Sequence, residues 1–369
     1  MGKRFFYTNL DVLRFFAFLL VFVSHLPIVS HSGLINFMFN QAGVIGVQLF
    51  FIISGFLITG LLLNERLETK EISLKKFYLR RVFRIFPLYF FSLLVILAIV
   101  LILDQPVVNF SNFFGYYFTF LGNFDRIFNG FETVHYFLGA GVLWSIAVEE
   151  QFYLFIPILL SKLRKQRTIL WVLSSIYVLT LCYKFYVIRI FSDSELAFRT
   201  LSFSPLSVFD AITFGCLLGV ISIHFKNPLE RIVKRIPWFG IIFAVLGVFG
   251  LIIVDFYQEN SYISAIIVRQ AITVLFTLII ALVCFHPRLK MVSMNKGVQW
   301  LNQLGKISFG LYIYHDLTIM FFDHYTDHLA LIISASMAST IVISWASFNF
   351  LEQPFLRYKK RFEVVRTRE

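Results

Sequence analysis

Stretches of about twenty apolar residues recur along almost the whole chain, and they restrict its fold more than any other feature. A helix of that length crosses the hydrocarbon core of a bilayer, where a backbone must satisfy its own hydrogen bonds. The composition agrees, because 58% of the 369 residues are hydrophobic and 47 are phenylalanine. We therefore expect an all-α fold, a polytopic transmembrane helical bundle of about ten spans. The predicted spans are approximately 10–28, 43–63, 85–104, 143–161, 168–188, 205–225, 238–256, 263–285, 303–322 and 328–352.

Basic residues are distributed very unevenly over the connections between these spans. The two termini and the connections on their side hold 26 of the 33 lysines and arginines, whereas the opposite side holds only Arg126, Arg189 and Arg199. Because basic loops stay on the cytoplasmic side, both termini are predicted to be cytoplasmic. The net charge of +12 is thus explained by topology, and nucleic-acid binding is not supported.

The first span, Leu10–His25, carries three residues that a lipid-facing helix should not carry, Asp11, Arg14 and His25. In a helix, Arg14 and His25 lie within about 20° of one face and are separated by a rise of roughly 16 Å. Ionisable groups at such depth are costly and usually face a polar cavity or a partner. Asp11 and Arg14 also interrupt the apolar run, so the segment is interpreted as a retained helix and not as a signal peptide.

The fourth predicted span contains two adjacent carboxylates, Glu149 and Glu150. Neighbouring helical residues point about 100° apart, so the two are expected to have different partners. We expect one of them to be catalytic and the other structural, without deciding which. Ser145, Glu149 and Tyr153 form a polar stripe on one face, and a pair between Glu149 and His25 is permitted by their depth. The structural alternative pairs one glutamate with Lys184 or Arg269.

Further polar residues are candidates for the same cavity. Arg80 and Arg84 stand four residues apart beside Arg81, and arginine forks suit phosphate groups. Ser54, Asp210 and His315 also lie within apolar spans.

The aromatic run 112–121 is too short to cross the bilayer and is interpreted as a re-entrant or interfacial piece, although an ordinary aromatic belt is the simpler interpretation. No histidine or cysteine spacing indicates a metal site, so none is proposed.

Five of these stretches, in order, resemble acyltransferase family 3, a group of integral-membrane O-acyltransferases. The resemblance covers about residues 9–358. The matching stretches are Leu10-Asp11-x-Leu13-Arg14 with Val23-Ser24-His25, the run from Gly46 to Ile58, Arg80-Arg81-x-x-Arg84-Ile85-x-Pro87-x-Tyr89, Trp144-Ser145-Ile146-Ala147-Val148-Glu149-Glu150-Gln151-Phe152-Tyr153, and Phe350-x-Glu352-x-Pro354. Val12, Phe15 and Phe16 depart from the residues usual in the family.

The resemblance implies transfer of an acyl group, commonly acetyl, from cytoplasmic acyl-CoA to a hydroxyl of a cell-surface or lipid-linked glycan. It places the CoA phosphates on Arg14, Arg80, Arg81 and Arg84, at the inner level. A sugar hydroxyl needs a base, for which His25 is suited, with Glu149 or Glu150 beside it. Ser145, Trp144 or a tyrosine could stabilise the oxyanion.

Direct transfer and transfer through an acyl-enzyme both remain open at this point, as does the alternative of a transporter or flippase for a glycan or lipid-linked substrate. We expect a single membrane domain over residues 1–369 in the inner or plasma membrane, with acyl-CoA, a glycan acceptor and the lipid bilayer as its partners and no soluble domain.

Overall fold

The computed structural model describes residues 7, 9–28, 32–102, 110–130, 139–191, 194–257, 262–292 and 295–364. Within these ranges the chain forms helices and no strand, as expected for a membrane bundle. The helices are α1 (Leu10–His25), α2 (Gly33–Thr69), α3 (Leu74–Ile102), α4 (Phe110–Tyr117), α5 (Gly122–Phe128), η2 (Ala140–Leu143), α6 (Trp144–Lys162), α7 (Gln166–Phe191), α8 (Glu195–Phe203), α9 (Pro205–His224), α10 (Lys226–Arg235), α11 (Gly240–Tyr257), α12 (Tyr262–Phe285), α13 (Pro287–Val292), α14 (Lys296–Lys306), α15 (Ser308–Tyr325), α16 (Leu329–Ser347), η3 (Phe348–Glu352), α17 (Gln353–Lys359) and η4 (Lys360–Phe362).

Eight segments of the described chain are long and apolar enough to cross a membrane, which confirms a helical membrane bundle. They coincide with eight of the ten predicted spans. The other two predicted spans correspond to α1 and to α15 with its preceding segment. With 16 residues α1 is about 24 Å long, less than the roughly 30 Å of a hydrocarbon core. The number of spans and the side of each terminus therefore stay predictions.

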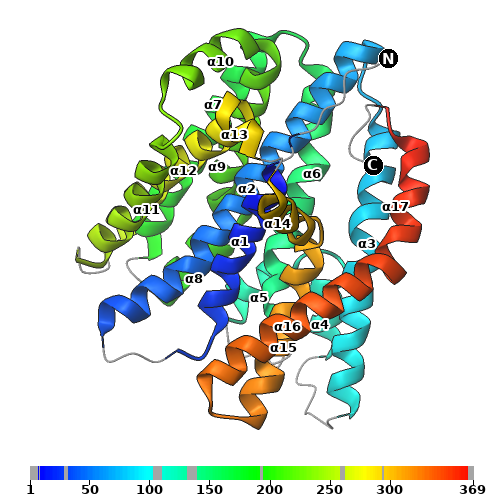
Figure 1. Cartoon of the computed structure of the whole chain (residues 1–369), viewed down its shortest axis with the longest axis vertical. Helices are drawn as coiled ribbons and strands as arrows, with labels where there is room; N and C mark the ends of the chain where they lie inside the picture. The colour runs from blue at the N-terminus through cyan, green and yellow to red at the C-terminus, as the bar shows by residue number, and fades with distance from the viewer. Residues whose placement is uncertain are drawn as a thin grey trace.

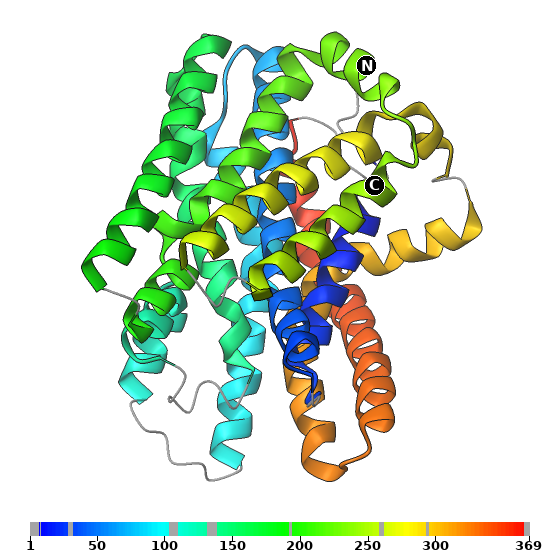
Figure 2. The same ribbon diagram turned by 90° about the vertical axis from the view of Figure 1, so that its left-hand side faces the viewer.

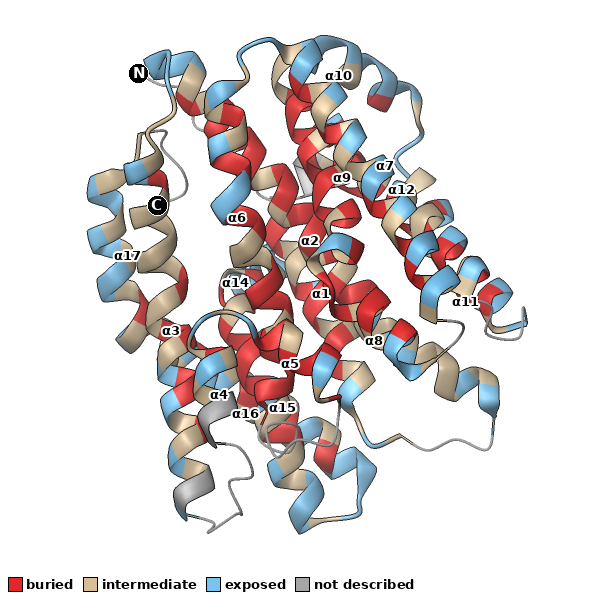
Figure 3. Cartoon of the chain, turned by 180° about the vertical axis from the view of Figure 1, so that it is seen from behind, coloured by how far each residue is buried: buried red, intermediate tan, exposed pale blue. Residues whose placement is uncertain are grey.

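The long helices are arranged around α1 and α2, which lie in the interior of the bundle (Figure 1). The helix α1 packs against α2, α14 and α15, and α2 packs most extensively against α9. Figure 3 shows the buried residues concentrated along these central helices, whereas exposed residues predominate on the outlying ones, as at α10 and α17. Asp11 of α1 is thus buried in the bundle and Arg14 is partly buried, whereas His25 at the end of the helix is exposed.

Glycine permits close contact between the backbones of α2 and α9 in this core. A Cβ atom on Gly55 would collide with the backbone of Ile212, and one on Gly215 would collide with the backbone of Ile52. Small residues let helix backbones approach within this distance in membrane proteins. The glycines of the second span therefore serve helix packing, and they fix the position of the neighbouring Ser54.

The ninth predicted span, 303–322, is divided in the structure into two helices with different directions. The helix α14 ends at Lys306 and α15 begins at Ser308. Figure 2 shows α14, gold in the colour bar, lying across the direction of α15 and α16. Gly305 rests directly on the backbone of Asp11, where any Cβ would collide. This contact holds α14 against the beginning of α1, next to the polar residues of that helix.

The aromatic run 112–121, predicted to be re-entrant or interfacial, forms most of α4 and the turn that follows it, and α5 comes directly after the run. Both helices are too short to cross a bilayer. The two helices pack against each other, and α5 packs against α6 and α8. Tyr117 is buried between them and donates a hydrogen bond to Asp125 (3.1 Å). This arrangement buries Arg126, which the topology had assigned to an outer connection.

Candidate active site

A cavity of about 1170 Å³ lies inside the bundle between α1, α2, α3, α6 and the C-terminal helices. Its volume exceeds the roughly 300–1,000 Å³ of typical small-molecule sites, so it has room for a large substrate. Eight of the candidate residues line it, and they come from four helices that are distant in the sequence. These residues are Asp11, Arg14, Ser54, Arg81, Arg84, Ser145, Glu149 and Tyr153.

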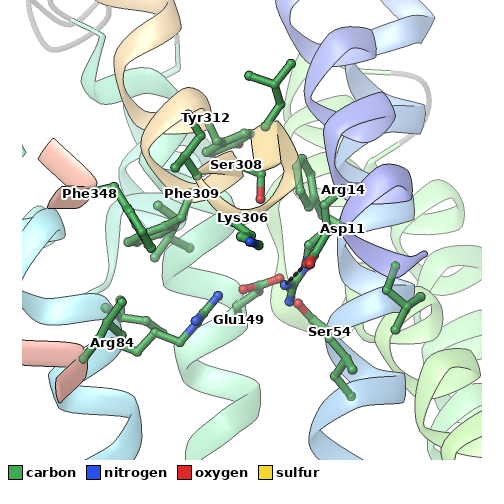
Figure 4. A pocket seen from close by; sticks show the side chains of 18 of the residues that line it. Asp11, Arg14, Ser54, Arg84, Glu149, Lys306, Ser308, Phe309, Tyr312 and Phe348 are labelled. Carbon is green, nitrogen blue, oxygen red and sulfur yellow. Dashed lines mark hydrogen bonds and ion pairs between the residues drawn. The ribbon is translucent and has the colours of Figure 1, made fainter. Parts of the chain in front are cut away.

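Glu149 lies at the centre of the cavity (Figure 4). Its Oε1 accepts a hydrogen bond from the Ser54 hydroxyl at 2.6 Å, and its Oε2 accepts one from the Tyr153 hydroxyl at 3.3 Å. The positive charges of Arg81 and Arg14 act on the carboxylate. Because two hydroxyls fix its orientation from two helices, Glu149 is a positioned carboxylate that faces the cavity.

Glu150 has different surroundings, as the 100° rotation between neighbouring residues predicts. It does not line the cavity, and its Oε1 is buried without a hydrogen-bond partner among the described residues. Of the two carboxylates, only Glu149 can therefore contact a molecule bound in the cavity. The sequence could not make this choice because both side chains lie in the same apolar helix.

The cations of the cavity are held in two different ways. Arg14 forms an ion pair with Asp11 one turn away, at 3.5 Å. The guanidinium of Arg81 stacks over the Tyr153 ring, 4.8 Å from its centroid. Arg84 points toward Glu149 from the opposite side of the cavity from Arg14 (Figure 4). The lining thus combines cations with one central carboxylate, a pattern suited to a ligand with several negative charges.

Arg80 lies outside this cavity, although it is on the same helix as Arg84. Its guanidinium forms an ion pair with Glu65 at 2.8 Å and donates a hydrogen bond to the carbonyl of Phe362 at 2.9 Å. Arg80 thus holds α2, α3 and the C-terminal segment together.

Four further cations line the cavity that were not predicted from the sequence to be ligands, namely Lys306, Arg357, Lys359 and Lys360.

Asp210 does not line the cavity and belongs to a separate buried cluster. It accepts hydrogen bonds from Lys184 and from the amide of Gln270 (2.6 Å). Lys184 therefore pairs with Asp210, and not with either glutamate of the fourth span. Trp144 also does not line the cavity, since its indole packs edge-on against the rings of Phe51 and Phe203.

His25 and His315 form a second group, beyond the end of the cavity. Their imidazole centroids are 4.9 Å apart, with the rings perpendicular. His25 is exposed, and its Nδ1 lies 2.9 Å from the carbonyl oxygen of Val21. Since a carbonyl can only accept, Nδ1 is the donor in the neutral ring, and this tautomer leaves the lone pair on Nε2, as a general base requires. His315 is fully buried, and its Nδ1 likewise donates to the carbonyl of Tyr312, at 2.7 Å.

The charges of His25 and of Arg126 both act on Asp316, the residue after His315. A pair between Glu149 and His25, which their depth permits, is not formed among the described residues, since the polar contacts of Glu149 are with Ser54 and Tyr153 and its charge partners are Arg81 and Arg14. The sequence places Arg126 in an outer connection and gives no sign of this role, because Arg126 is buried only by the packing of α5.

Tyr312 separates the cavity from the histidine pair. Its side chain lines the cavity, while its own carbonyl holds His315 and its ring centroid is 5.8 Å from that of His315. The Tyr312 hydroxyl is bonded to Ser145 at 2.7 Å and to the carbonyl of Val142 at 3.0 Å. The Tyr312 side chain therefore lies between the cavity and the histidine pair. The spacing of Tyr312 and His315, three residues apart on one helix, was the available sequence signal.

No group of three or more His, Cys, Asp or Glu side chains is arranged for a metal ion in the part of the chain that the structure describes. The three cysteines are all free thiols. The polar groups of this site are thus carboxylates, guanidinium and ammonium groups, hydroxyls and imidazoles, which are suited to binding anions and moving protons.

The fold and the site are those of a helical membrane protein with a polar, cation-lined cavity and a nearby histidine pair. The sequence comparison identifies the enzyme class. The family profile of an acyltransferase domain matches residues 7–348, so the chain belongs to this acyltransferase family. The resemblance to acyltransferase family 3 is thereby confirmed.

Among curated proteins, the chain is similar to the O-acetyltransferase OatA of Staphylococcus aureus (strain NCTC 8325 / PS 47). The two are 27% identical over 379 residues, which cover 96% of this chain and 58% of OatA. A putative O-acetyltransferase of Staphylococcus aureus (strain COL) is also 27% identical, over 366 residues that cover 94% of this chain and 57% of that protein. The chain thus spans less than three fifths of the length of these relatives. No solved structure shows significant similarity to it.

Proposed function

We propose that this protein is a membrane O-acyltransferase that moves an acyl group, in the first instance acetyl, from a coenzyme A thioester to a hydroxyl of a cell-surface or lipid-linked glycan. The observation that carries the proposal is the cavity in which Arg14, Arg84 and Lys306 surround the carboxylate of Glu149 and which ends at Tyr312, next to the histidine pair. The names of the relatives support acetyl as the group transferred.

The cations of the lining would bind the phosphates of coenzyme A, since guanidinium groups form paired hydrogen bonds with phosphate oxygens. Arg14, Arg81, Arg84 and Lys306 are the residues we assign to this role. Arg80, which the resemblance also suggested, is proposed to hold the helices that carry the other arginines, because Glu65 already occupies its guanidinium.

The acceptor hydroxyl would approach from the side of His25, whose Nε2 takes its proton. The hydroxyl oxygen then attacks the thioester carbonyl, the carbon–sulfur bond breaks, the acyl group stays on that oxygen, and the coenzyme A thiolate leaves with the proton that His25 had accepted. Asp316 would stabilise the imidazolium that forms on His25, in place of the glutamate expected from the sequence. The hydroxyls of Tyr312 and Ser145 are the candidates for stabilising the oxyanion.

Mass spectrometry of surface glycans tests this proposal, using cells that lack the protein and cells that carry the wild type or a variant. The wild type should add one acetyl unit to one polymer, and His25→Ala should remove that unit at normal protein abundance. His324→Ala is the matched control, because His324 is an exposed histidine at the end of α15. Unchanged glycans with the wild type, or full modification by His25→Ala, would contradict the proposal.

A further inference from the structure

The cavity has a mouth on the side of the bundle, between α14 and α16. Trp300 of α14 and Val342 and Trp345 of α16 line the cavity, yet their side chains are 61%, 63% and 58% exposed. A residue that lines a cavity and is also exposed on the outside of the molecule lies at an opening. The helix α14 packs on α1 and α16 packs on α15, so the two helices that flank the mouth are held by different partners.

This mouth lies on the exposed face of an apolar helix. The most apolar 18-residue window of the segment Leu329–Phe362, which contains α16, has a mean hydropathy of 1.9, and only 22% of that window is buried in the protein. The exposed face of such an apolar helix is expected to meet lipid. Val342 and Trp345 are exposed on it, in the last two turns of α16.

The side of the cavity that α16 forms is apolar. Arg14, Arg84 and Lys306 surround Glu149 in the interior, whereas Ile341, Val342 and Trp345 line the side of α16 (Figure 4 shows the charged end). The backbone at the end of α16 widens into the π-helical turn η3, of which Phe348 and Asn349 also line the cavity. Such turns inside helices are frequent at functional sites.

In the direction of the histidine pair the cavity is bounded by polar groups. Tyr312 lines it there, and its hydroxyl is bonded to Ser145 and to the carbonyl of Val142. An apolar chain attached to a carbonyl near Glu149 would meet these hydroxyls in that direction. The side mouth offers such a chain an apolar lining instead.

We propose that the mouth between α14 and α16 receives the hydrocarbon chain of the acyl donor, so that thioesters with chains longer than acetyl bind with the chain directed into the bilayer. The proposal rests on the proposed function, since it assumes a coenzyme A thioester in the cavity. The groups of such a donor would lie in this order: the phosphates at the cationic end of the cavity, the thioester beside Glu149 and the hydrocarbon chain at the mouth.

The two possible geometries of an acyl site predict opposite dependences on chain length. A closed pocket sized for acetyl rejects each added methylene by 10-fold or more. An open apolar mouth instead favours each methylene, by up to about fourfold, which corresponds to about 0.8 kcal/mol. We therefore expect kcat/KM for hexanoyl-CoA to equal or exceed that for acetyl-CoA, measured as thiol release by the full chain in lipid nanodiscs.

Closing the mouth should change this preference. Val342→Trp should lower the ratio of kcat/KM for hexanoyl-CoA to that for acetyl-CoA by at least tenfold. Ile343→Trp is the matched control, because Ile343 is the next residue, is also exposed to lipid, and does not line the cavity. A hexanoyl-CoA analogue with a photoreactive diazirine at the chain end should label α14 and α16, which tests the same point without any substitution.

Three results would overturn the inference. Turnover of acetyl-CoA with rejection of hexanoyl-CoA would show a closed acyl pocket, and it would leave the proposed function intact. Labelling of α14 and α16 only by a diazirine phospholipid, and not by the acyl-CoA analogue, would show that the mouth holds membrane lipid. Absence of any thioester turnover, in a monodisperse preparation, would remove the proposed function and this inference with it.

Discussion

At the scale of single residues, the sequence identified the polar groups of the site but not their partners. Asp11, Arg14 and Glu149 stood out because ionisable side chains are rare within apolar spans. A helical period gives the face on which a residue lies, and it does not give what packs against that face. Glu149 and Glu150 were therefore indistinguishable, as were Arg80 and Arg84, until Ser54 and Glu65 were seen to contact one member of each pair.

The two glutamates provide a first prediction. Glu149→Gln should lower acetyl-CoA turnover by about 10²–10⁴-fold, the range expected when a proton-transferring or charge-stabilising group is lost. Glu150→Gln should have a much smaller effect on turnover per folded molecule, because Glu150 does not line the cavity. The measurement is thiol release from acetyl-CoA by purified protein, and the assignment would be wrong if the two variants ranked in the opposite order.

The arginines of α3 provide a second prediction. Arg84→Met should raise KM for acetyl-CoA, by roughly tenfold for a lost charge-assisted contact of about 1.5 kcal/mol. Arg80→Met should instead lower the thermal midpoint, since it leaves the buried Glu65 carboxylate without its guanidinium partner. Thioester kinetics and thermal unfolding of both variants separate the roles, and a larger KM effect for Arg80→Met would restore it as a ligand.

At the scale of secondary-structure elements, helix existence was predictable and helix breaks were not. Eight predicted spans coincide with long apolar helices, because hydropathy alone determines them. The break at Ile307 was not predicted, since it depends on the contact of Gly305 with the backbone of α1. Lys306 and Tyr312 lie on either side of that break and line the cavity, and neither was predicted from the sequence to be a site residue.

The contact between α7 and α9 provides the third prediction, at this scale. Lys184 and Asp210 are buried and paired, and removing one partner of a buried pair costs about 3–5 kcal/mol. Lys184→Met should therefore lower the thermal midpoint markedly, whereas Lys184→Met with Asp210→Leu should recover much of the loss. Thermal unfolding in detergent measures both. A single variant as stable as the wild type would show that the pair does not hold the helices together.

At the scale of the whole molecule, the all-α membrane fold and the acyltransferase family could be read from the sequence, because both depend on patterns along the chain. The sequence does not predict how the polar side chains are distributed among separate sites. They form a cationic cavity around Glu149, a histidine pair beyond Tyr312, and a separate cluster at Asp210. This division results from tertiary packing of helices that are distant in the sequence, and it suggests that donor and acceptor approach from different sides.

The proposed function requires that the cavity binds the coenzyme A thioester with the reacting carbonyl between Glu149 and Tyr312. A cryo-electron microscopy structure of the protein in nanodiscs with a non-hydrolysable thioether analogue of acetyl-CoA tests this binding mode most directly. We expect the phosphates beside Arg84 and Lys306 and the acetyl end between Glu149 and Tyr312. An analogue bound outside the cavity, or with its phosphates at the histidine pair, would show that the proposed binding mode is wrong.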